Sequence, residues 1–190
     1  MTKLDPQWQR AGYTLRLGRP AEAETYYANF TRRDPEGDRF TGSGSFTKQQ
    51  VVEFYLHTIT DPNRYDLLLV APDGRITGES VLNDIDWTLR CANYRIYLFD
   101  PALRNHGWGT WLVTTARDFA FDQLHLHRLG LDVFSFNPRA HHVYQRAGFI
   151  DEGRLRDAVW DSATGQYGDD ILMGMLASDP RPREAVGTAH

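Results

Sequence analysis

A glycine-rich turn in the middle of the chain has the features of an anion site. The segment from Arg104 to Trp111 reads RNHGWGTW and separates a strand-like run from a helix-like run. Gly107 and Gly109 lack a Cβ atom, so the backbone can fold tightly there and a ligand can approach it closely. The following helix presents unpaired N–H groups and a partial positive charge, and Arg104 adds a charge at the entrance. The turn therefore predicts a site for a small phosphate ligand.

Two common phosphate-binding motifs are absent, and the turn alone also fits a plain strand-to-helix connection. The sequence has no Gly-x4-Gly-Lys-Ser/Thr loop and no three-glycine dinucleotide fingerprint. A second motif lies downstream, in the segment VFSFNPRAHHVYQRAGF of residues 133–149. Asn137 ends a predicted strand and caps a predicted helix, which carries Tyr144 seven residues later. Taken alone, Asn137 fits a helix cap and Tyr144 fits a core aromatic residue.

The elements that must position both motifs follow from hydrophobic periodicity and helix capping. The expected order is a strand, two helices, three strands, a helix, a strand, a helix and closing strands, which is one α/β domain with a mixed sheet. Thr47 and Gln50 form a predicted capping box, and the Gly- and Ser-rich stretch 34–46 is expected to be a loop. Strands are expected over 13–18, 65–71, 75–86, 91–100, 128–136 and 171–176, and helices over 20–33, 47–60, 110–125 and 137–147.

Together, the two motifs make the chain similar to the GNAT N-acetyltransferase superfamily. RNHGWGT matches the Arg/Gln-x-x-Gly-x-Gly/Ala turn that binds the pyrophosphate of acetyl-CoA in that superfamily. NPRAHHVYQRAGF resembles its next motif, Asn-x-x-Ala-x-x-x-Tyr-x-x-x-Gly-Phe, and the two motifs occur in the family's order. The segments YRIYLFDPALR and DEGRLRDAVW look like the branch of Rim-type N-terminal acetyltransferases and spermidine acetyltransferases. The resemblance covers roughly residues 13–176.

The resemblance implies a mixed, largely antiparallel sheet flanked by helices, with two splayed parallel central strands near 95–99 and 129–136. Acetyl-CoA would lie in the cleft between these strands as the cosubstrate, and a bulge near Leu98 would turn a backbone N–H toward the thioester oxygen. Trp108 departs from the family pattern by its bulk, and we expect it to narrow the cofactor entrance. The predicted cofactor-binding residues are Leu98, Arg104, Asn105, His106, Gly107, Trp108, Gly109, Thr110, Asn137 and Tyr144.

The implied reaction is direct attack of a primary amine on the acetyl-CoA thioester. The leaving thiolate has a pKa of about 8.5 and a tyrosine hydroxyl one of about 10, so Tyr144 is the predicted catalytic acid. Glu79 is the predicted base, because family members often place a carboxylate on this strand near the acceptor. Asp84 and Asp86 are alternatives, a water relay would also serve, and each carboxylate also fits a solvated surface position.

The acceptor is open between a protein N-terminus, a polyamine, an amino acid and an antibiotic amine. In this fold the loop between the first two helices borders the acceptor, so Phe40 and Phe46 are expected to shape its site. The main alternative function is a non-catalytic acyl-CoA-binding or sensing module, which would keep 104–110 but would not need Tyr144. A nucleotide-binding protein is a third alternative, which the absent P-loop lysine disfavours. Dimers are common in the superfamily, so the resemblance also allows a homodimer.

Composition restricts the remaining classes of function. The 190-residue chain has a formal net charge of −4, which fits one globular domain and disfavours a nucleic-acid partner. Its one cysteine, Cys91, cannot form an internal disulfide, and no apolar run has the length of a signal peptide or membrane span. The histidines lack the spacing of metal ligands. We therefore expect a cytoplasmic protein with no membrane partner and no metal site, built as one domain over 1–178 with a disordered tail over 179–190.

Overall fold

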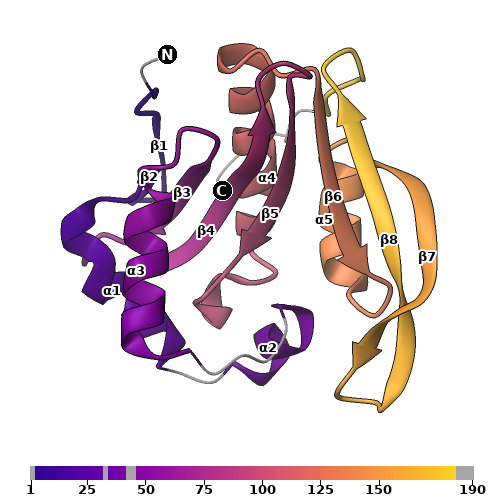
Figure 1. The fold of residues 1–190 in the computed structure, drawn as a ribbon, viewed down its shortest axis with the longest axis horizontal. Coiled ribbons are helices and arrows are strands. Elements are labelled where there is room, and N and C mark those ends of the chain that lie inside the picture. Colours follow the sequence, from indigo (N-terminus) through magenta and orange to yellow (C-terminus); the bar gives the residue numbers. More distant parts are fainter. Residues whose placement is uncertain (1–2, 32–33, 42–45, 183–190) are drawn as a thin grey trace, which may run out of the picture.

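The computed structural model describes residues 3–31, 34–41 and 46–182 of the chain. One mixed sheet of strand order β1-β2-β3-β4-β5-β6-β8-β7 forms its centre (Figure 1). Among the strand pairs described, β5 and β6 run parallel and the others run antiparallel, so the expected mixed, largely antiparallel sheet is confirmed. The strands are β1 Gln7–Arg10, β2 Tyr13–Leu17, β3 Tyr65–Val70, β4 Ile76–Asp86, β5 Cys91–Tyr97, β6 Arg128–Phe134, β7 Ile150–Asp161 and β8 Gln166–Leu176.

Helices cover both faces of this sheet (Figure 1). One face carries α1 and α3, and the other carries α4 and α5, each packed on its own group of buried residues. Short 3-10 turns at Pro20–Glu22, Ala28–Phe30 and Pro101–Leu103 connect the elements, and a π-helical turn at Phe119–Gln123 extends α4. The α-helices are α1 Ala23–Tyr27, α2 Pro35–Thr41, α3 Lys48–Thr58, α4 Trp108–Asp118 and α5 Pro138–Arg146.

The sequence of β3 shows why two helical layers are needed. All six residues of YDLLLV are buried. Side chains alternate between the two faces of a strand, so a run that is apolar at every position must be covered on both sides. Leu67 and Leu69 pack in the core that contains α4, whereas Leu68 and Val70 pack against α1 and α3.

The central feature of the sheet is the separation of β5 from β6. The two strands pair at three positions, from Cys91 opposite Arg128 to Asn93 opposite Gly130. Beyond Asn93 they diverge, and α2 lies at the open end of the resulting splay (Figure 1). The predicted splay of two parallel central strands is confirmed.

Three elements differ from the expectations. The hairpin of β1 and β2 was not predicted; its turn places Ala11 and Gly12 at φ 48° and 82°, as in the tight turns that match strand twist. No bounds were predicted for strand β7 either. The expected loop 34–46 contains helix α2, because Asp34 accepts a hydrogen bond from the Gly37 N–H and Pro35 occupies the first helical position. Residues 42–45 of that stretch lie outside the described residues.

The described part of the predicted tail contacts the domain. The Asp179 carboxylate accepts a hydrogen bond of 2.8 Å from the Leu176 N–H. The buried Arg117 donates to the Pro182 carbonyl oxygen at 3.2 Å. Residues 183–190 lie outside the described residues, so the disorder expected there stays a prediction, as does the domain limit at 178.

Candidate functional site

A cleft of about 1870 Å³ opens where β5 and β6 separate. This volume exceeds the roughly 300–1,000 Å³ of sites that hold one small molecule, so a long cofactor and a second ligand have room. Its walls come from segments far apart in the chain, which are α1, α2, the splayed strands, the glycine turn and α5. The turn, Asn137 and Tyr144 all line this cleft, as does the buried carboxylate of Glu79.

The glycine turn has the conformation that its sequence predicts. Asn105 and Gly107 have positive φ, 65° and 76°, and Gly107 immediately precedes α4. Backbone in this region directs successive N–H groups to one side, and the start of α4 adds a partial positive charge. Asn105, Gly107, Gly109 and Thr110 line the cleft, whereas His106 is exposed and lies outside the lining residues. The turn can therefore present backbone donors to an anion in the cleft.

Trp108 does not narrow the entrance of the cleft, which corrects the expectation from its bulk. Its side chain is buried against the rings of Tyr13 and Trp111, at centroid distances of 4.7 and 5.7 Å. The Arg10 guanidinium lies over the Trp108 ring at 5.2 Å. Trp108 thus anchors the start of α4 to the β1–β2 hairpin, and a contribution of its backbone to a ligand site stays a prediction.

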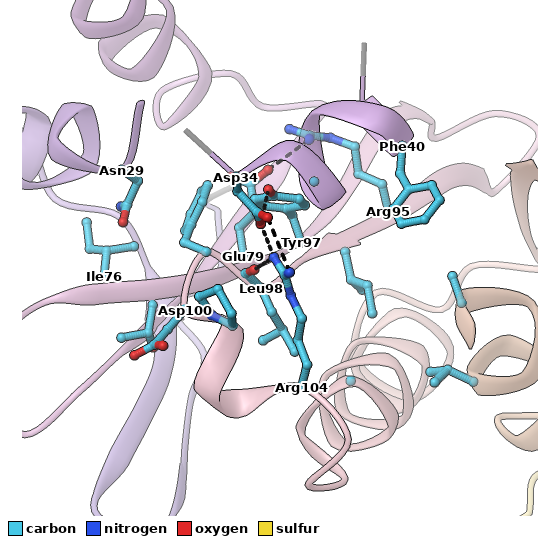
Figure 2. A pocket seen from close by; sticks show the side chains of 18 of the residues that line it. Asn29, Asp34, Phe40, Ile76, Glu79, Arg95, Tyr97, Leu98, Asp100 and Arg104 are labelled. Atoms are coloured by element: carbon cyan, nitrogen blue, oxygen red, sulfur yellow. Dashed lines mark hydrogen bonds and ion pairs between the residues drawn. The ribbon is translucent and has the colours of Figure 1, made fainter. Parts of the chain in front are cut away.

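Arg104 lines the cleft and binds protein groups there, and its expected role as a charge at the phosphate entrance stays a prediction. Its guanidinium bonds to the Asp34 carboxylate (Figure 2). It also donates to the Leu98 carbonyl oxygen at 3.0 Å. Burial alone would raise the pKa of Asp34, but hydrogen bonds from Arg104, from the Gly37 N–H and from the Tyr97 hydroxyl hold that pKa below its usual value. Arg104 therefore fastens the start of α2 to the end of β5.

An extra residue interrupts the pairing of β4 with β5 next to Leu98. The two strands stay in register up to Tyr97, and a continuous register would place Gly78 opposite Leu98 and then Thr77 opposite Phe99. Instead, the Thr77 carbonyl oxygen accepts a hydrogen bond of 3.1 Å from the Asp100 N–H. An additional residue on one strand leaves a backbone group outside the ladder. The irregularity expected near Leu98 is present, while its contact with a thioester oxygen stays a prediction.

Asn137 and Tyr144 reach the cleft from α5. The Asn137 side chain accepts a hydrogen bond of 3.2 Å from the Ala140 N–H, which confirms the predicted cap. Tyr144 lies about two turns further along the helix and is 5% exposed, with its ring edge-on to Tyr94 at 6.3 Å. A backbone hydrogen bond joins its hydroxyl to Ile96, on the part of β5 that has left β6. The hydroxyl therefore lies at the splay.

Asp132 on β6 lines the same cleft, and motif reasoning did not find it. Its side chain is exposed and has no hydrogen-bond or ion-pair partner among the described residues. Burial, and then the negative charge of Asp132, raise the pKa of Tyr144 above its ordinary value, and the bond with Ile96 only partly opposes them. The available signal was the alternation of Asp132 with the buried Leu131 and Val133.

Glu79 lies in the cleft wall, but both of its carboxylate oxygens are already bonded. The Tyr26 hydroxyl donates to one oxygen and the Arg95 guanidinium to the other, each at 2.8 Å. Burial and the Glu79 charge raise the pKa of Tyr26 well above its ordinary value, so this hydroxyl stays a donor. Asp84 and Asp86 lie at the far end of β4 and outside the lining residues, and Asp86 accepts two backbone N–H groups of the β4–β5 turn.

One side of α5 adds positive charge to the cleft. Arg139, His142 and Arg146 line it, and their spacing of three and four residues places them on one helical face. This spacing is a sequence signal that the motif analysis passed over. The two arginines, beside a turn that can present backbone N–H groups, suit a ligand with several phosphates.

Across 3–31, 34–41 and 46–182, no group of three His, Cys, Asp or Glu side chains is arranged to hold a metal ion. No helix in these ranges combines the length and apolar character needed to cross a bilayer.

The sequence of this chain matches a family of known proteins. A model described as the acetyltransferase (GNAT) family matches residues 25–149. Spermidine N(1)-acetyltransferase of Vibrio cholerae serotype O1 is 29% identical over 129 residues, which is 68% of this chain and 73% of that protein. Spermidine N(1)-acetyltransferase of Escherichia coli K12 is 32% identical over 105 residues, so the match spans about half of each chain, 55% in both cases.

Solved structures share the fold. The crystal structure of spermidine N-acetyltransferase from Vibrio cholerae in complex with CoA and spermine superposes with a TM-score of 0.77 at 24% identity, covering 89% of this chain and 98% of that one. A dodecameric structure of the Vibrio cholerae enzyme in an intermediate state has a TM-score of 0.72 at 24% identity, covering 89% and 96%.

Proposed function

Since the chain belongs to the acetyltransferase (GNAT) family and is therefore an N-acetyltransferase that uses acetyl-CoA, we propose that acetyl transfer to a primary amine takes place in the cleft between β5 and β6. The observation that carries this proposal is the Tyr144 hydroxyl, which lies at the splay in a cleft that also contains the glycine turn. The cofactor would extend from the turn 104–110 along β5, with its thioester near Leu98 and its sulfur near Tyr144.

Two groups of residues would hold the cofactor's phosphates and its pantetheine arm. The backbone N–H groups of the turn would bind the pyrophosphate, because a helix start preceded by residues of positive φ favours an anion. The basic face of α5 would add charge for the remaining phosphate. Asn137 would contact the pantetheine amides in addition to capping α5.

Gly109 offers a way to block cofactor binding without disturbing the fold. A Cβ there would lie 3.7 Å from Ile96 and 3.8 Å from Val143, which are ordinary contact distances. Gly109→Val is therefore expected to fold, while its methyl groups occupy the cleft beside the turn and weaken acetyl-CoA binding by at least about tenfold, or about 1.4 kcal/mol. Titration calorimetry with acetyl-CoA measures this. Gly109→Ala is the control and should bind nearly as wild type; a folded Gly109→Val protein with unchanged affinity would contradict the placement.

The proposed reaction forms one bond and breaks one. The neutral amine nitrogen attacks the thioester carbon, and the C–S bond breaks as the C–N bond is completed. Before the attack, the ammonium form of the amine gives one proton to a carboxylate. The Tyr144 hydroxyl donates its proton to the departing thiolate, and the second proton, which the nitrogen loses as the C–N bond forms, restores the Tyr144 hydroxyl. The Tyr144 hydroxyl is protonated at neutral pH and so holds a proton that it can give to the thiolate. Burial raises the pKa of Tyr144, which keeps the hydroxyl protonated over a wider pH range but also makes it a weaker acid than an exposed tyrosine.

We propose Asp132 as the proton acceptor in place of Glu79. The oxygens of Glu79 are held by Tyr26 and Arg95, so an incoming ammonium would have to displace one of them. Asp132 lines the cleft without such a partner, and its charge acts on Tyr144, so it is close to the reacting groups. A carboxylate in this position can hold the ammonium form of the acceptor and receive its proton.

The acceptor class follows from the chemistry of attack. A protein N-terminus or a small primary amine supplies the nucleophile, and the related enzymes are named for spermidine. Phe40 and Phe46 line the cleft and would contact the acceptor, as would Tyr26 of α1 and Phe30 of the following 3-10 turn. The dodecamer formed by the Vibrio cholerae enzyme supports self-association as a further expectation for this chain.

Release of the CoA thiol separates the enzyme from a sensing module on the same fold. Acetyl-CoA is incubated with the protein and a panel of primary amines, and free thiol is followed with a chromogenic disulfide while mass spectrometry detects the acetylated amine. We expect amine-dependent thiol release and stoichiometric acetamide. Tight acetyl-CoA binding without thiol release for any amine would instead indicate a sensing module.

A further inference from the structure

Most of the carboxylates that line the cleft are paired with an arginine. Among the lining side chains that the structure describes, only Asp132 lacks such a partner. The others belong to three ion pairs, which are Asp34–Arg104, Glu79–Arg95 and Asp100–Arg75. The last is a wide contact of 3.7 Å, and its arginine also bonds to Asp73 at 2.7 Å.

The Glu79–Arg95 pair is oriented with its cation toward the open cleft. The Glu79 side chain is 4% exposed, whereas the Arg95 side chain is 42% exposed, and the two are joined at 2.8 Å. The second oxygen of Glu79 is occupied by the Tyr26 hydroxyl. The anion is therefore buried behind its partner, and a molecule in the cleft meets the positive charge of Arg95.

This charge arrangement suits one ammonium group and disfavours a second. A polyamine carries further ammonium groups beyond the one that reacts, and each needs a negative partner when it leaves water. Asp132 can serve the reacting group. A distal ammonium would meet Arg95, and like charges brought together repel most strongly where water is excluded.

The same wall is apolar around Arg95. Four lining aromatic residues form a continuous surface, with ring centroids 5.3 Å apart for Tyr26 and Phe30, 6.0 Å for Phe30 and Phe99, and 5.1 Å for Phe99 and Tyr97. Rings arranged in this way offer contact area to an uncharged acceptor body.

We infer that Arg95 is a specificity-determining residue, and that the acceptor is a monoamine with an uncharged apolar or aromatic body rather than a polyamine. Arg95 acts in two ways: it neutralises Glu79, which would otherwise attract a distal ammonium, and it repels that ammonium itself. The inference rests on the proposed function, since it names the substrate class of the same cleft.

Hexylamine and 1,6-diaminohexane form a matched pair for the test. They have the same carbon chain and the same reacting amine, and they differ in the distal ammonium. We expect kcat/KM, measured by thiol release and corrected for the two amines of the diamine, to favour hexylamine by at least about tenfold. 2-Phenylethylamine, an aromatic monoamine, should react at least as well as hexylamine.

Three variants assign the preference to Arg95. Arg95→Gln leaves Glu79 unpaired and should shift the ratio toward the diamine by at least about tenfold, whereas Arg95→Lys keeps the charge and should keep the preference for hexylamine. An unpaired buried Glu79 can destabilise the protein. The double variant Glu79→Gln/Arg95→Gln avoids this problem, because it removes both charges, and its ratio should fall between those of the wild type and Arg95→Gln.

The outcomes separate this inference from the function on which it rests. Equal or better turnover of the diamine by the wild type, with amine-dependent thiol release, would overturn the monoamine assignment and leave the acetyltransferase intact. A ratio that is the same in the wild type, in Arg95→Gln and in the double variant would remove Arg95 as its cause. Absence of thiol release with every amine would overturn both the proposed function and the inference.

Discussion

Replacement of Tyr144 by Phe is expected to lower kcat by about 10²–10⁴-fold, the usual contribution of a general acid. The substitution removes one buried hydroxyl that contacts the Ile96 backbone at the splay, and it retains the ring. Acetyl-CoA affinity should change little, because the bond to sulfur strengthens only as negative charge develops on it. Single-turnover kinetics with saturating acetyl-CoA measure the chemical step directly, and calorimetry measures the affinity.

Tyr94 is a matched control for this substitution. It is also a buried tyrosine of the cleft, but its hydroxyl bonds to the Ser80 hydroxyl at 2.9 Å. Tyr94→Phe should cost about 1 kcal/mol of unfolding free energy and keep its turnover. A folded Tyr144→Phe protein with the single-turnover rate of the wild type would exclude Tyr144 as the acid.

The pH profile gives an independent check on Tyr144. Its pKa is raised above the ordinary value of about 10, so the proton needed for transfer is present at all lower pH values. Loss of this proton should therefore cause no fall in kcat as the pH rises from 7 to about 10. A fall within that range that disappears in Tyr144→Phe would contradict the raised pKa.

Replacement of Asp132 by Asn is expected to lower kcat/KM for the amine by about 10²–10³-fold at pH 7, within the range of general base catalysis. The variant keeps the shape of the side chain and loses the charge that would hold the ammonium and accept its proton. The deficit should shrink as the pH rises from 7 to 9, because each pH unit increases the neutral fraction of an amine of pKa about 10 by about tenfold. Initial rates of thiol release over this pH range measure the effect.

Asp84→Asn is the control for this variant, because Asp84 is an exposed residue of β4 outside the cleft lining. Its kcat/KM should match that of the wild type at each pH. If the deficit of Asp132→Asn stays constant with pH, Asp132 binds the acceptor without taking its proton. If no deficit appears, the base lies elsewhere, and Glu79 returns as the candidate.

Features whose interactions are local could be predicted from the sequence. Thr47 and Gln50 form the predicted capping box, and Asn137 caps α5 as expected. Gly107 takes the positive φ that its place before α4 suggests. In each case the deciding hydrogen bond or dihedral angle involves residues no more than three positions apart, so neighbouring residue types were sufficient evidence.

Helix α2 was not predicted, because the local sequence suggests a loop. Gly37 in DPEGDRF resembles a loop residue, since glycine weakens a helix. In the structure a Cβ at Gly37 would lie 1.6 Å from the Tyr97 hydroxyl oxygen. A residue without a Cβ is needed there, because α2 packs closely on the end of β5. The two contacting residues are 60 positions apart, so no local sequence pattern predicts the contact.

The sequence by itself determined the α/β fold through its repeating patterns, and the family resemblance carried by its two spaced motifs implied the splayed central strands and placed the glycine turn and Tyr144 near them. Only the tertiary structure decided which charged side chains are available to a ligand. Asp34 joins Arg104 across 70 positions, and Glu79 bonds to Tyr26 across 53, while Asp132 has no described partner. A carboxylate can hold an ammonium only where no arginine or hydroxyl already satisfies it, and those partners are brought to it by the packing of distant elements.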